Sequence, residues 1–274
     1  MRHHRCYASN AEKQAAYRQR QRAAVLHQIP VVHGEGYTLY QGDAEVLVPL
    51  VGACDHCLTD PPYEAEAHTR MRRTRAALEG RQIHAALDFA PITAGQRRLL
   101  CMLRCGWILI FCQAEAIGRY QALLGAKYKR AIVWVKPDST PQFTGDRPAM
   151  GYESIVCAWG QPGGSQWNAG GKRGIYHHNI HDDEARGHPT QKPLALMKAL
   201  IRDFTQSGEV VLDPFMGSGT TGVACLEQQR RFIGIERDPH YFATACARLE
   251  AAQRQGQLFA APRPMHQEAL FAAP

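Results

Sequence analysis

A regular alternation of apolar strands and helical segments near the carboxyl end is the feature that most limits how this chain can fold. Residues 209–213 (EVVLD) and 231–236 (RFIGIE) are short apolar runs, and segments of helical composition follow them at 219–229 and 239–255. Successive parallel strands need a crossover connection, which is usually a helix. The pattern therefore predicts an α/β protein with a mostly parallel sheet and helices on both faces.

The same alternation extends toward the amino end, with less regular segments between the elements. We expect the further strands at 36–43, 106–112, 131–135 and 154–159, and the further helices at 11–28, 94–105, 113–124 and 190–206. The 274 residues suffice for one large α/β domain, which we place at 31–256. A basic arm (1–30) would precede this domain, and a disordered tail (257–274) would follow it. Residues 64–90 are expected to form a mobile loop, and 137–187 a loop-rich insert.

Positive charge is concentrated in two parts of the chain, whose formal net charge is +7. Residues 1–22 are rich in Arg and Lys. The second cluster consists of Arg70, Arg72, Arg73, Arg75 and Arg81. Clustered positive charge favours an anionic polymer as partner, although a solvated surface would have the same composition.

The nine cysteines lie mostly in apolar stretches, and their odd number gives no regular disulfide framework. Reduced thiols are typical of the cytoplasm, and neither a membrane-spanning run nor a secretory leader stands out, so we expect a cytoplasmic protein. Cys54 and Cys57 form an isolated CxxC pair. A zinc site needs further ligands of suitable geometry, so we expect these two cysteines to pack in the core and predict no metal.

The strand at 209–213 runs directly into a glycine-rich turn, DPFMGSGTTG (213–222), before the next helix. Glycines let the backbone approach a ligand closely, and the helix that follows offers free N–H groups. Glu236 ends the next strand, where an acid can bind both hydroxyls of a ribose. Together these features predict a site for a nucleoside-type cofactor.

The turn also contains Gly217, Gly219 and Gly222, which spell the GxGxxG fingerprint of dinucleotide-binding proteins. A dinucleotide fold would need several further strand–helix units, yet only about fifty residues follow the turn. Asp213 at the strand tip would repel a pyrophosphate, whereas it suits a positively charged amino group. A nicotinamide or flavin cofactor is therefore disfavoured.

A second strand end carries the rigid turn Asp60-Pro61-Pro62-Tyr63. The prolines stiffen this turn and leave the Pro61 carbonyl free of intrachain pairing. The Asp60 carboxylate and this carbonyl are two acceptors side by side, which suit the two donors of an exocyclic NH₂ group. Tyr63 adds a face on which a flat heterocycle can stack. The turn is therefore interpreted as a grip for an amino-bearing base.

The motif order resembles that of the class I S-adenosylmethionine-dependent DNA amino-methyltransferases of the β group. The matching segments are YQGDA (40–44), TDPPY (59–63), GWILIFC (106–112), VWVKP (133–137), HPTQKP (188–193), DPFMGSGTTG (213–222) and GIERDPHYF (234–242). In this permuted order the Asp-Pro-Pro-Tyr element comes first, the target-recognition insert second and the cofactor loop last. The resemblance implies a Rossmann-like class I methyltransferase fold in which 137–187 is that insert.

The resemblance also implies a set of residues that bind S-adenosylmethionine. Glu236 would bind the ribose and Asp43 would lie near the adenine of the cofactor. His188, Thr190 and Lys192 would open a helix against the cofactor, with Lys192 placed to pair with its methionine carboxylate. The full set is Asp43, His188, Thr190, Lys192, Asp213, Phe215, Gly217, Ser218, Gly219, Thr220 and Glu236.

The same resemblance makes Asp60, Pro61, Pro62 and Tyr63 the catalytic motif and double-stranded DNA the substrate. The target atom is inaccessible in a duplex, so the base must be flipped out. In this group an Asp at the first motif position usually accompanies adenine N6, and a Ser cytosine N4, so we expect an adenine-N6 methyltransferase. Cytosine N4, an RNA amine or a catalytically inactive DNA-binding protein are the alternatives. A restriction partner, a phage or prophage origin and a dimer are compatible with the sequence.

The insert and the basic loop should supply the contacts to DNA. TPQFTGDRP (140–148) and MGYE (150–153) look like structured loops beside the base pocket. The expected DNA-binding residues are Arg70, Arg72, Arg73, Arg147, Lys172 and Arg173, and His177, His178 and His181 are further candidates.

The tail contains two short matches to the Gln-x-x-Leu-Phe peptide that docks into bacterial sliding clamps. These matches are QGQLF (255–259) and QEALF (267–271). They suggest a clamp as a further partner, although five-residue matches also arise by chance.

Overall fold

The computed structural model describes residues 23–63, 90–141, 145, 148–180 and 191–259. Within these residues, one sheet of nine strands has the order β1-β2-β9-β8-β3-β4-β6-β5-β7. The strands are β1 (Val31–Gly34), β2 (Tyr37–Gln41), β3 (His56–Thr59), β4 (Trp107–Cys112), β5 (Tyr128–Val135), β6 (Tyr152–Trp159), β7 (Ile175–His177), β8 (Val210–Asp213) and β9 (Arg231–Glu236). Neighbouring strands are parallel except at the β1–β2, β4–β6 and β5–β6 contacts. The sheet is therefore mostly parallel, as predicted.

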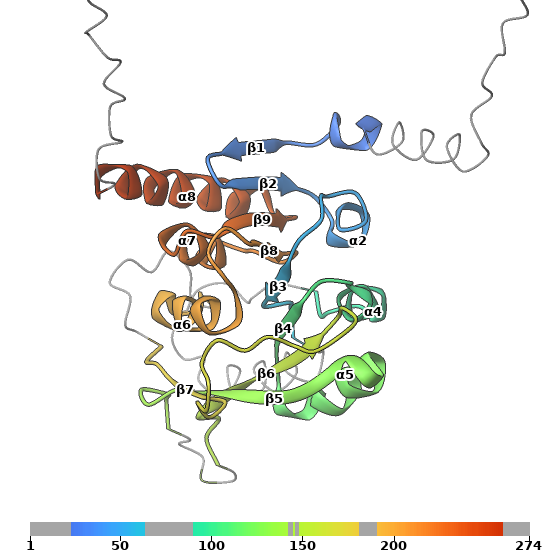
Figure 1. Ribbon diagram of the computed structural model, residues 1–274, viewed down its shortest axis with the longest axis vertical. Coiled ribbons are helices and arrows are strands. Elements are labelled where there is room, and N and C mark those ends of the chain that lie inside the picture. Colours follow the sequence, from blue (N-terminus) through green and yellow to red (C-terminus); the bar gives the residue numbers. More distant parts are fainter. Residues whose placement is uncertain (1–22, 64–89, 142–144, 146–147, 181–190, 260–274) are drawn as a thin grey trace, which may run out of the picture.

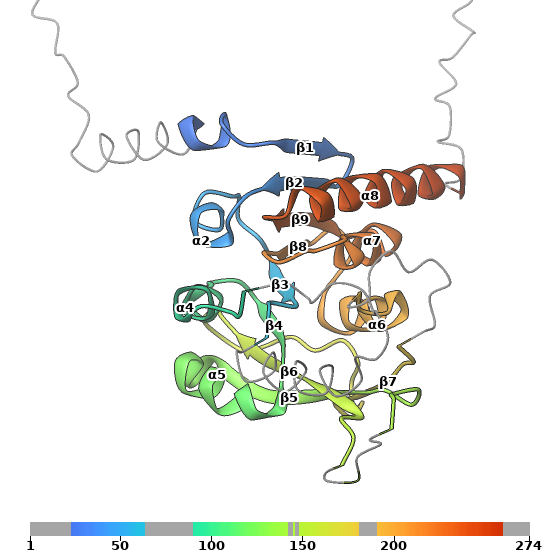
Figure 2. The ribbon, with the colours of Figure 1, turned by 180° about the vertical axis from the view of Figure 1, so that it is seen from behind.

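Helices cover both faces of this sheet, with α2, α4 and α5 on one face and α6, α7 and α8 on the other (Figure 1). Figure 2 shows the same division from behind. The helices are α2 (Ala44–Leu47), α4 (Ala94–Met102), η1 (Ala114–Ala116), α5 (Ile117–Leu124), η2 (Gly125–Lys127), α6 (Leu194–Phe204), α7 (Thr220–Glu227) and α8 (Pro239–Phe259), of which η1 and η2 are 3-10 helices. All six residues of β4 are buried, because helices cover this central strand on both sides.

The strand order changes direction between β8 and β3, which are parallel neighbours in the sheet. From β3 the chain continues to β4 on one side, whereas β8 continues to β9 on the other. In open α/β sheets, ligands bind outside the carboxyl ends of the strands at such a switch point. This arrangement brings together the residues that follow β3 and those that follow β8.

The antiparallel strand β6 adds residues from a different part of the chain to the same edge of the sheet. Its first residues pair with the last residues of its neighbours: Ser154 lies opposite Cys112, and Tyr152 opposite Val135. Glu153, the second residue of β6, therefore lies near the carboxyl ends of β4 and β5.

Two strands were not expected from the sequence. β1 pairs with β2 at one edge of the sheet, and the three-residue β7 pairs with β5 at the other edge. Both are short edge strands, and edge strands carry a weaker apolar signal than buried central ones. The expected strand 36–43 is the shorter β2.

Several helices differ from expectation at their ends. α4 ends at Met102 because Leu103 leaves the helical region with ψ at 143°. The expected helix at 113–124 is divided into η1 and α5. α6 begins after Pro193, so Lys192 lies before the helix rather than inside it. α8 continues to Phe259 and thus extends into the segment predicted as a disordered tail.

Other expectations fall partly or wholly outside the described residues. Residues 23–26 are helical, which is the described part of the expected helix at 11–28. The basic loop is described only at Ala90, and the second clamp-like segment, 267–271, is not described. The first clamp-like segment, 255–259, forms the end of α8.

The CxxC pair packs as expected, with Cys57 buried in the core under α4 and α5 and Cys54 packed against the same cluster. The described cysteines are free thiols. In the described part of the chain, no helix is both long enough and apolar enough to cross a membrane.

Candidate active site at the switch point

A cavity of about 440 Å³ opens at the carboxyl edge of the sheet, where β3 and β8 end. It is lined by the segments that follow β2, β3, β8 and β9, by the start of β6 and by the residues before α6. The cavity contains these residues predicted from the sequence: Asp43, Asp60, Pro61, Pro62, Tyr63, Lys192, Asp213, Phe215, Gly217, Ser218, Thr220 and Glu236. The fold therefore brings the two predicted sites, for a nucleoside and for an amino-bearing base, into one space.

Asp213, the last residue of β8, is only 2% exposed. Its Oδ1 accepts hydrogen bonds from the Thr59 hydroxyl (2.7 Å) and the Phe215 N–H (3.1 Å), and its Oδ2 accepts one from the Thr221 hydroxyl (2.6 Å). Burial raises the pKa of Asp213 to about 6, although these three hydrogen bonds oppose the shift. Among the described residues this carboxylate has hydrogen-bond donors around it but no cationic partner, so a positively charged ligand would stabilise its ionised form.

Glu236, the last residue of β9, holds the glycine-rich turn in place. One of its oxygens accepts a hydrogen bond from the Gly217 N–H (3.0 Å), and the other accepts one from the Asp238 N–H (2.7 Å). Gly217 and Gly219 have positive φ values of 53° and 82°, which glycine adopts without a steric penalty. Burial is the main cause that raises the pKa of Glu236. Backbone N–H groups of Gly217, Arg237 and Asp238 bond to this carboxylate, which has about four acceptor sites and so keeps capacity for a ligand hydroxyl.

Arg248 of α8 makes hydrogen bonds to the same turn. Its Nη1 donates to the Ser218 carbonyl oxygen (2.7 Å), to the Ser218 hydroxyl (3.0 Å) and to the Thr220 hydroxyl (3.1 Å). The Ser218 hydroxyl in turn lies 3.5 Å from the Gln191 side-chain oxygen. These contacts couple the turn to α8 and to the segment before α6.

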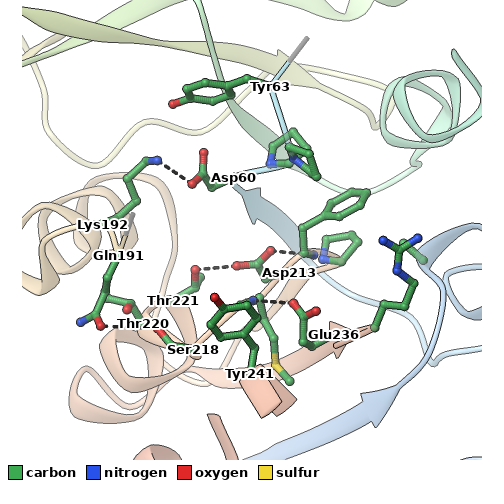
Figure 3. Close-up of a pocket in the computed structure, with 18 of the residues that line it drawn as sticks. Asp60, Tyr63, Gln191, Lys192, Asp213, Ser218, Thr220, Thr221, Glu236 and Tyr241 are labelled. Carbon is green, nitrogen blue, oxygen red and sulfur yellow. Dashed lines mark hydrogen bonds and ion pairs between the residues drawn. The ribbon is translucent and has the colours of Figure 1, made fainter. Parts of the chain in front are cut away.

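Asp60 lies at the other end of the cavity, between Tyr63 and Asp213 (Figure 3). Its Oδ2 accepts a hydrogen bond from Lys192 Nζ, whereas its Oδ1 is buried and has no hydrogen-bond partner among the described residues. Burial raises the pKa of Asp60, Lys192 opposes this effect, and the nearby Glu153 carboxylate adds to it. A buried acceptor without a partner is costly, so a ligand donor at Oδ1 would be favourable.

Glu153 connects Tyr63 to two lysines. Its Oε2 accepts a hydrogen bond from the Tyr63 hydroxyl (2.6 Å) and lies 3.3 Å from Lys192 Nζ, and its Oε1 pairs with Lys136 Nζ. Burial alone would raise the pKa of Glu153, but Lys192 and Lys136 outweigh it and lower the pKa to about 2. Burial and the Glu153 charge raise the pKa of Tyr63 well above its usual value, so Tyr63 stays neutral and keeps its hydroxyl as a donor.

Some predicted residues lie elsewhere. Gly219 does not line the cavity but is the N-cap residue before α7, where a side chain would meet Leu249. Asp43 lines the cavity and also caps α2, since its Oδ1 accepts from the Glu45 N–H (2.7 Å). Lys192 pairs with Asp60 in this structure, and its pairing with the methionine carboxylate of the cofactor stays a prediction. The following predicted residues lie outside the described part of the chain: His188, Thr190, Arg70, Arg72, Arg73, Arg147 and His181.

Of the expected DNA-binding residues, two are described. Lys172 pairs with Asp203, and its ammonium lies 4.1 Å from the centre of the Tyr176 ring, so it joins the insert to α6. Arg173 is exposed. Neither residue lines the cavity. The charge of Lys172 is paired within the protein, whereas Arg173 is exposed to solvent.

Sequence reasoning missed Glu153, Lys136 and Tyr241 as cavity residues. Glu153 belongs to the segment expected beside the base pocket, yet nothing in its local sequence marks it as a partner of Tyr63. Its position follows from the antiparallel direction of β6, which the apolar pattern of that strand does not reveal.

Comparison with known families decides between the readings of this cavity. Residues 54–247 match the family model described as DNA methylase, N6_N4_Mtase. The chain belongs to this DNA methylase family. This match confirms the predicted family. The family uses S-adenosylmethionine, so the predicted cofactor is confirmed at the level of the family.

Two curated proteins resemble the chain in sequence. The Type II methyltransferase M.XycI of Xanthomonas campestris pv. cyanopsidis is 35% identical over 197 residues, which cover 68% of this chain and 62% of M.XycI. The protein YubD of Escherichia coli (strain K12) is 32% identical over 235 residues, which cover 81% of this chain and 93% of YubD. The match to M.XycI thus leaves more than a third of that longer relative without a counterpart.

Solved structures confirm the fold of this DNA methylase. The M1.HpyAVI–SAM complex is 28% identical, has a TM-score of 0.57 and covers 78% of this chain and 98% of its own. The PvuII DNA methyltransferase, described as cytosine-N4-specific, is 14% identical with a TM-score of 0.59 and covers 80% of this chain and 92% of its own. At that identity the PvuII enzyme supports the fold alone. The predicted class I methyltransferase fold is therefore confirmed.

Proposed function

We propose that this DNA methylase transfers a methyl group from S-adenosylmethionine to the exocyclic N6 of an adenine flipped out of double-stranded DNA. The observation that carries the proposal is the buried Oδ1 of Asp60, which has no hydrogen-bond partner within the described part of the chain and lies in the same cavity as Asp213 and Glu236. A buried acceptor at that place suits an N–H donor of the target amine.

The cofactor would occupy the end of the cavity formed by the turn after β8 and by Glu236. Asp213 is an acid without a cationic partner among the described residues, and a positively charged amino group would offset the cost of its ionisation. Glu236 has lone pairs available for ribose hydroxyls, and Phe215 offers an apolar surface. When bound, S-adenosylmethionine supplies a methyl group on a positively charged sulfur, which is a good leaving group.

The target amine is a poor nucleophile, because its lone pair is delocalised into the aromatic ring. A hydrogen bond from this amine to Asp60 Oδ1, and a second to the Pro61 carbonyl, would favour a tetrahedral nitrogen with an exposed lone pair. Asp60 is also placed to accept the proton that the nitrogen releases after transfer. Tyr63 would stack on the base, and alignment of nitrogen and methyl carbon supplies the rest of the acceleration.

The choice of adenine rests on the Asp at the first position of the Asp-Pro-Pro-Tyr motif. Enzymes of the resembled group with Ser at this position usually act on cytosine N4, whereas Asp usually accompanies adenine. Cytosine N4 remains the second candidate, because the Asp form of the motif is not exclusive to adenine enzymes.

Nucleoside mass spectrometry tests this proposal. The protein would be incubated with S-adenosylmethionine and unmethylated DNA of mixed sequence, and the DNA would then be digested to nucleosides. We expect N6-methyladenine, and an Asp60→Ala variant as control should produce none. N4-methylcytosine would overturn the choice of base, and the absence of any methylated nucleoside from a protein that binds the cofactor would overturn the activity.

A further inference from the structure

Lys192 lies deep in the cavity beside two carboxylates and two aromatic rings. Its ammonium pairs with Asp60 Oδ2 and lies 3.3 Å from Glu153 Oε2, and only 10% of its side chain is exposed. The ammonium is also 5.5 Å from the centre of the Tyr63 ring and 5.1 Å from that of Phe111. Figure 3 shows Lys192 facing Asp60, at the end of the cavity where Tyr63 also lies.

The pairing makes the two oxygens of Asp60 unequal. Oδ2 is engaged by Lys192, whereas Oδ1 is buried and has no hydrogen-bond partner among the described residues. An Asp side chain held at one oxygen loses rotational freedom, so the remaining oxygen is presented in a fixed direction. Among the described residues, Oδ1 is thus the oxygen of Asp60 whose two lone pairs are both free for a donor on the substrate.

Glu153 is the second carboxylate beside Lys192. It pairs with Lys136 through Oε1, and through Oε2 it accepts a hydrogen bond from the Tyr63 hydroxyl at 2.6 Å. The cluster thus contains two carboxylates, two ammonium groups and a neutral phenol, so its charges balance. Its members come from the turn after β3, the residue after β5, the start of β6 and the segment before α6.

We propose that Lys192 is a positioning residue for methyl transfer: braced by Glu153, it holds one oxygen of Asp60 and keeps the other oxygen available as the acceptor of the target amine. This role rests on the proposed function and departs from the expectation that Lys192 pairs with the methionine carboxylate of the cofactor. The two roles predict different defects, because one belongs to the reacting end of the cavity and the other to the cofactor.

The charges around Asp60 determine how the two roles can be separated. Asp60 faces Lys192 before α6, Glu153 on β6, Lys136 after β5 and Asp213 on β8, with Tyr63 in its own turn. Lys192 and Lys136 lower the pKa of Asp60, whereas burial and Glu153 raise it. If Asp60 must be ionised to accept from the amine, the acidic limb of the rate profile follows this balance.

The first test is Lys192→Met, measured by single-turnover transfer of tritiated methyl groups to mixed-sequence duplex DNA at saturating S-adenosylmethionine, from about pH 5 to about pH 9. Loss of a neighbouring opposite charge should move the acidic limb to higher pH by about one to three units. Calorimetric titration should show cofactor affinity within about twofold of wild type. Lys198→Met is the matched control, because Lys198 lies on α6, pairs with Glu227 and does not line the cavity.

A second variant gives a shift of the opposite sign. Glu153→Gln keeps an acceptor for the Tyr63 hydroxyl but removes a like charge beside Asp60, so the limb should move to lower pH. This variant decides the matter if Lys192→Met fails to fold, as judged by its thermal unfolding.

An acidic limb that stays at its wild-type position in Lys192→Met overturns the proposal, whether or not cofactor affinity falls. The same holds for a limb that does not move, or moves upward, in Glu153→Gln. A wild-type protein that methylates no DNA would instead defeat the proposed function itself, so the two failures are distinguishable.

Discussion

Asp213 is a buried acid that the folded protein holds at an energetic cost, and Asp213→Asn should therefore stabilise the ligand-free protein. Asp213 is 2% exposed, and its carboxyl group accepts hydrogen bonds from the Thr59 and Thr221 hydroxyls and the Phe215 N–H. An Asn side chain is nearly the same size, its oxygen can accept from Thr59 and Phe215, and the Thr221 hydroxyl can rotate to accept from its NH₂ group. The substitution thus removes the charge while the hydrogen bonds are kept.

The expected magnitude follows from the pKa of Asp213, which burial raises from its usual 3.8 to about 6. Below about pH 4 the carboxyl is protonated in both the folded and the unfolded chain, so the charge contributes nothing. As pH rises, the unfolded chain releases its proton first, and the folded protein loses stability between about pH 4 and about pH 6. The shift of roughly two units corresponds to about 3 kcal/mol above that range.

Urea denaturation followed by tryptophan fluorescence measures this effect. The free energy of unfolding of Asp213→Asn should exceed that of wild type by about 1–3 kcal/mol near pH 8, and the difference should vanish near pH 4. Asp203→Asn is the matched control, because Asp203 is also buried but pairs with Lys172 and Arg202, so its replacement should destabilise the protein. A stability difference for Asp213→Asn that does not change with pH, or that is unfavourable at pH 8, would refute the reasoning.

Two further predictions concern the division of roles and the glycine turn. Asp60→Ala should reduce methyl transfer below detection while its affinity for the cofactor stays within about twofold of wild type. Asp213→Ala should lose cofactor binding in calorimetric titration. An equal loss of cofactor affinity in both variants would contradict the assigned roles. Gly219→Ala should lower the free energy of unfolding by about 2–4 kcal/mol, because φ is 82° and the new Cβ would lie 2.8 Å from Leu249 Cδ1. Gly208→Ala, with a similar φ of 83° but open space around it, should cost only about 1–2 kcal/mol, and equal effects would contradict a role for the overlap.

Local sequence was enough to predict much of this fold. Strands β4, β8 and β9 are continuous apolar runs, and such runs become central strands wherever helices can cover both faces. The prolines after Asp60 fix a turn by their own covalent geometry, and the glycines after Asp213 allow backbone angles that other residues avoid. These features depend on neighbouring residues only, so the sequence predicted them without knowledge of the sheet order.

The edges of the fold were harder to predict. β1 and β7 are held by pairing with a neighbouring strand rather than by a long apolar run, and β7 lies within a polar insert. The direction of β6 was also not predictable, since a buried strand has the same composition in a parallel and an antiparallel neighbourhood. Its direction is what carries Glu153 to the cavity rather than to the opposite edge of the sheet.

The sequence by itself determined which groups this protein possesses: an acid in a rigid turn, an acid before a glycine loop and an acid at the next strand end. Only the tertiary structure decided which charges meet. Lys192 and Asp60 are 132 residues apart in the chain. Asp60 follows β3, and Lys192 precedes α6, which leads into β8. The two side chains meet because β3 and β8 are neighbours in the sheet. Hydrogen bonds and charge pairs act over a few ångströms, so the pKa of a buried acid depends on neighbours that only the completed fold supplies.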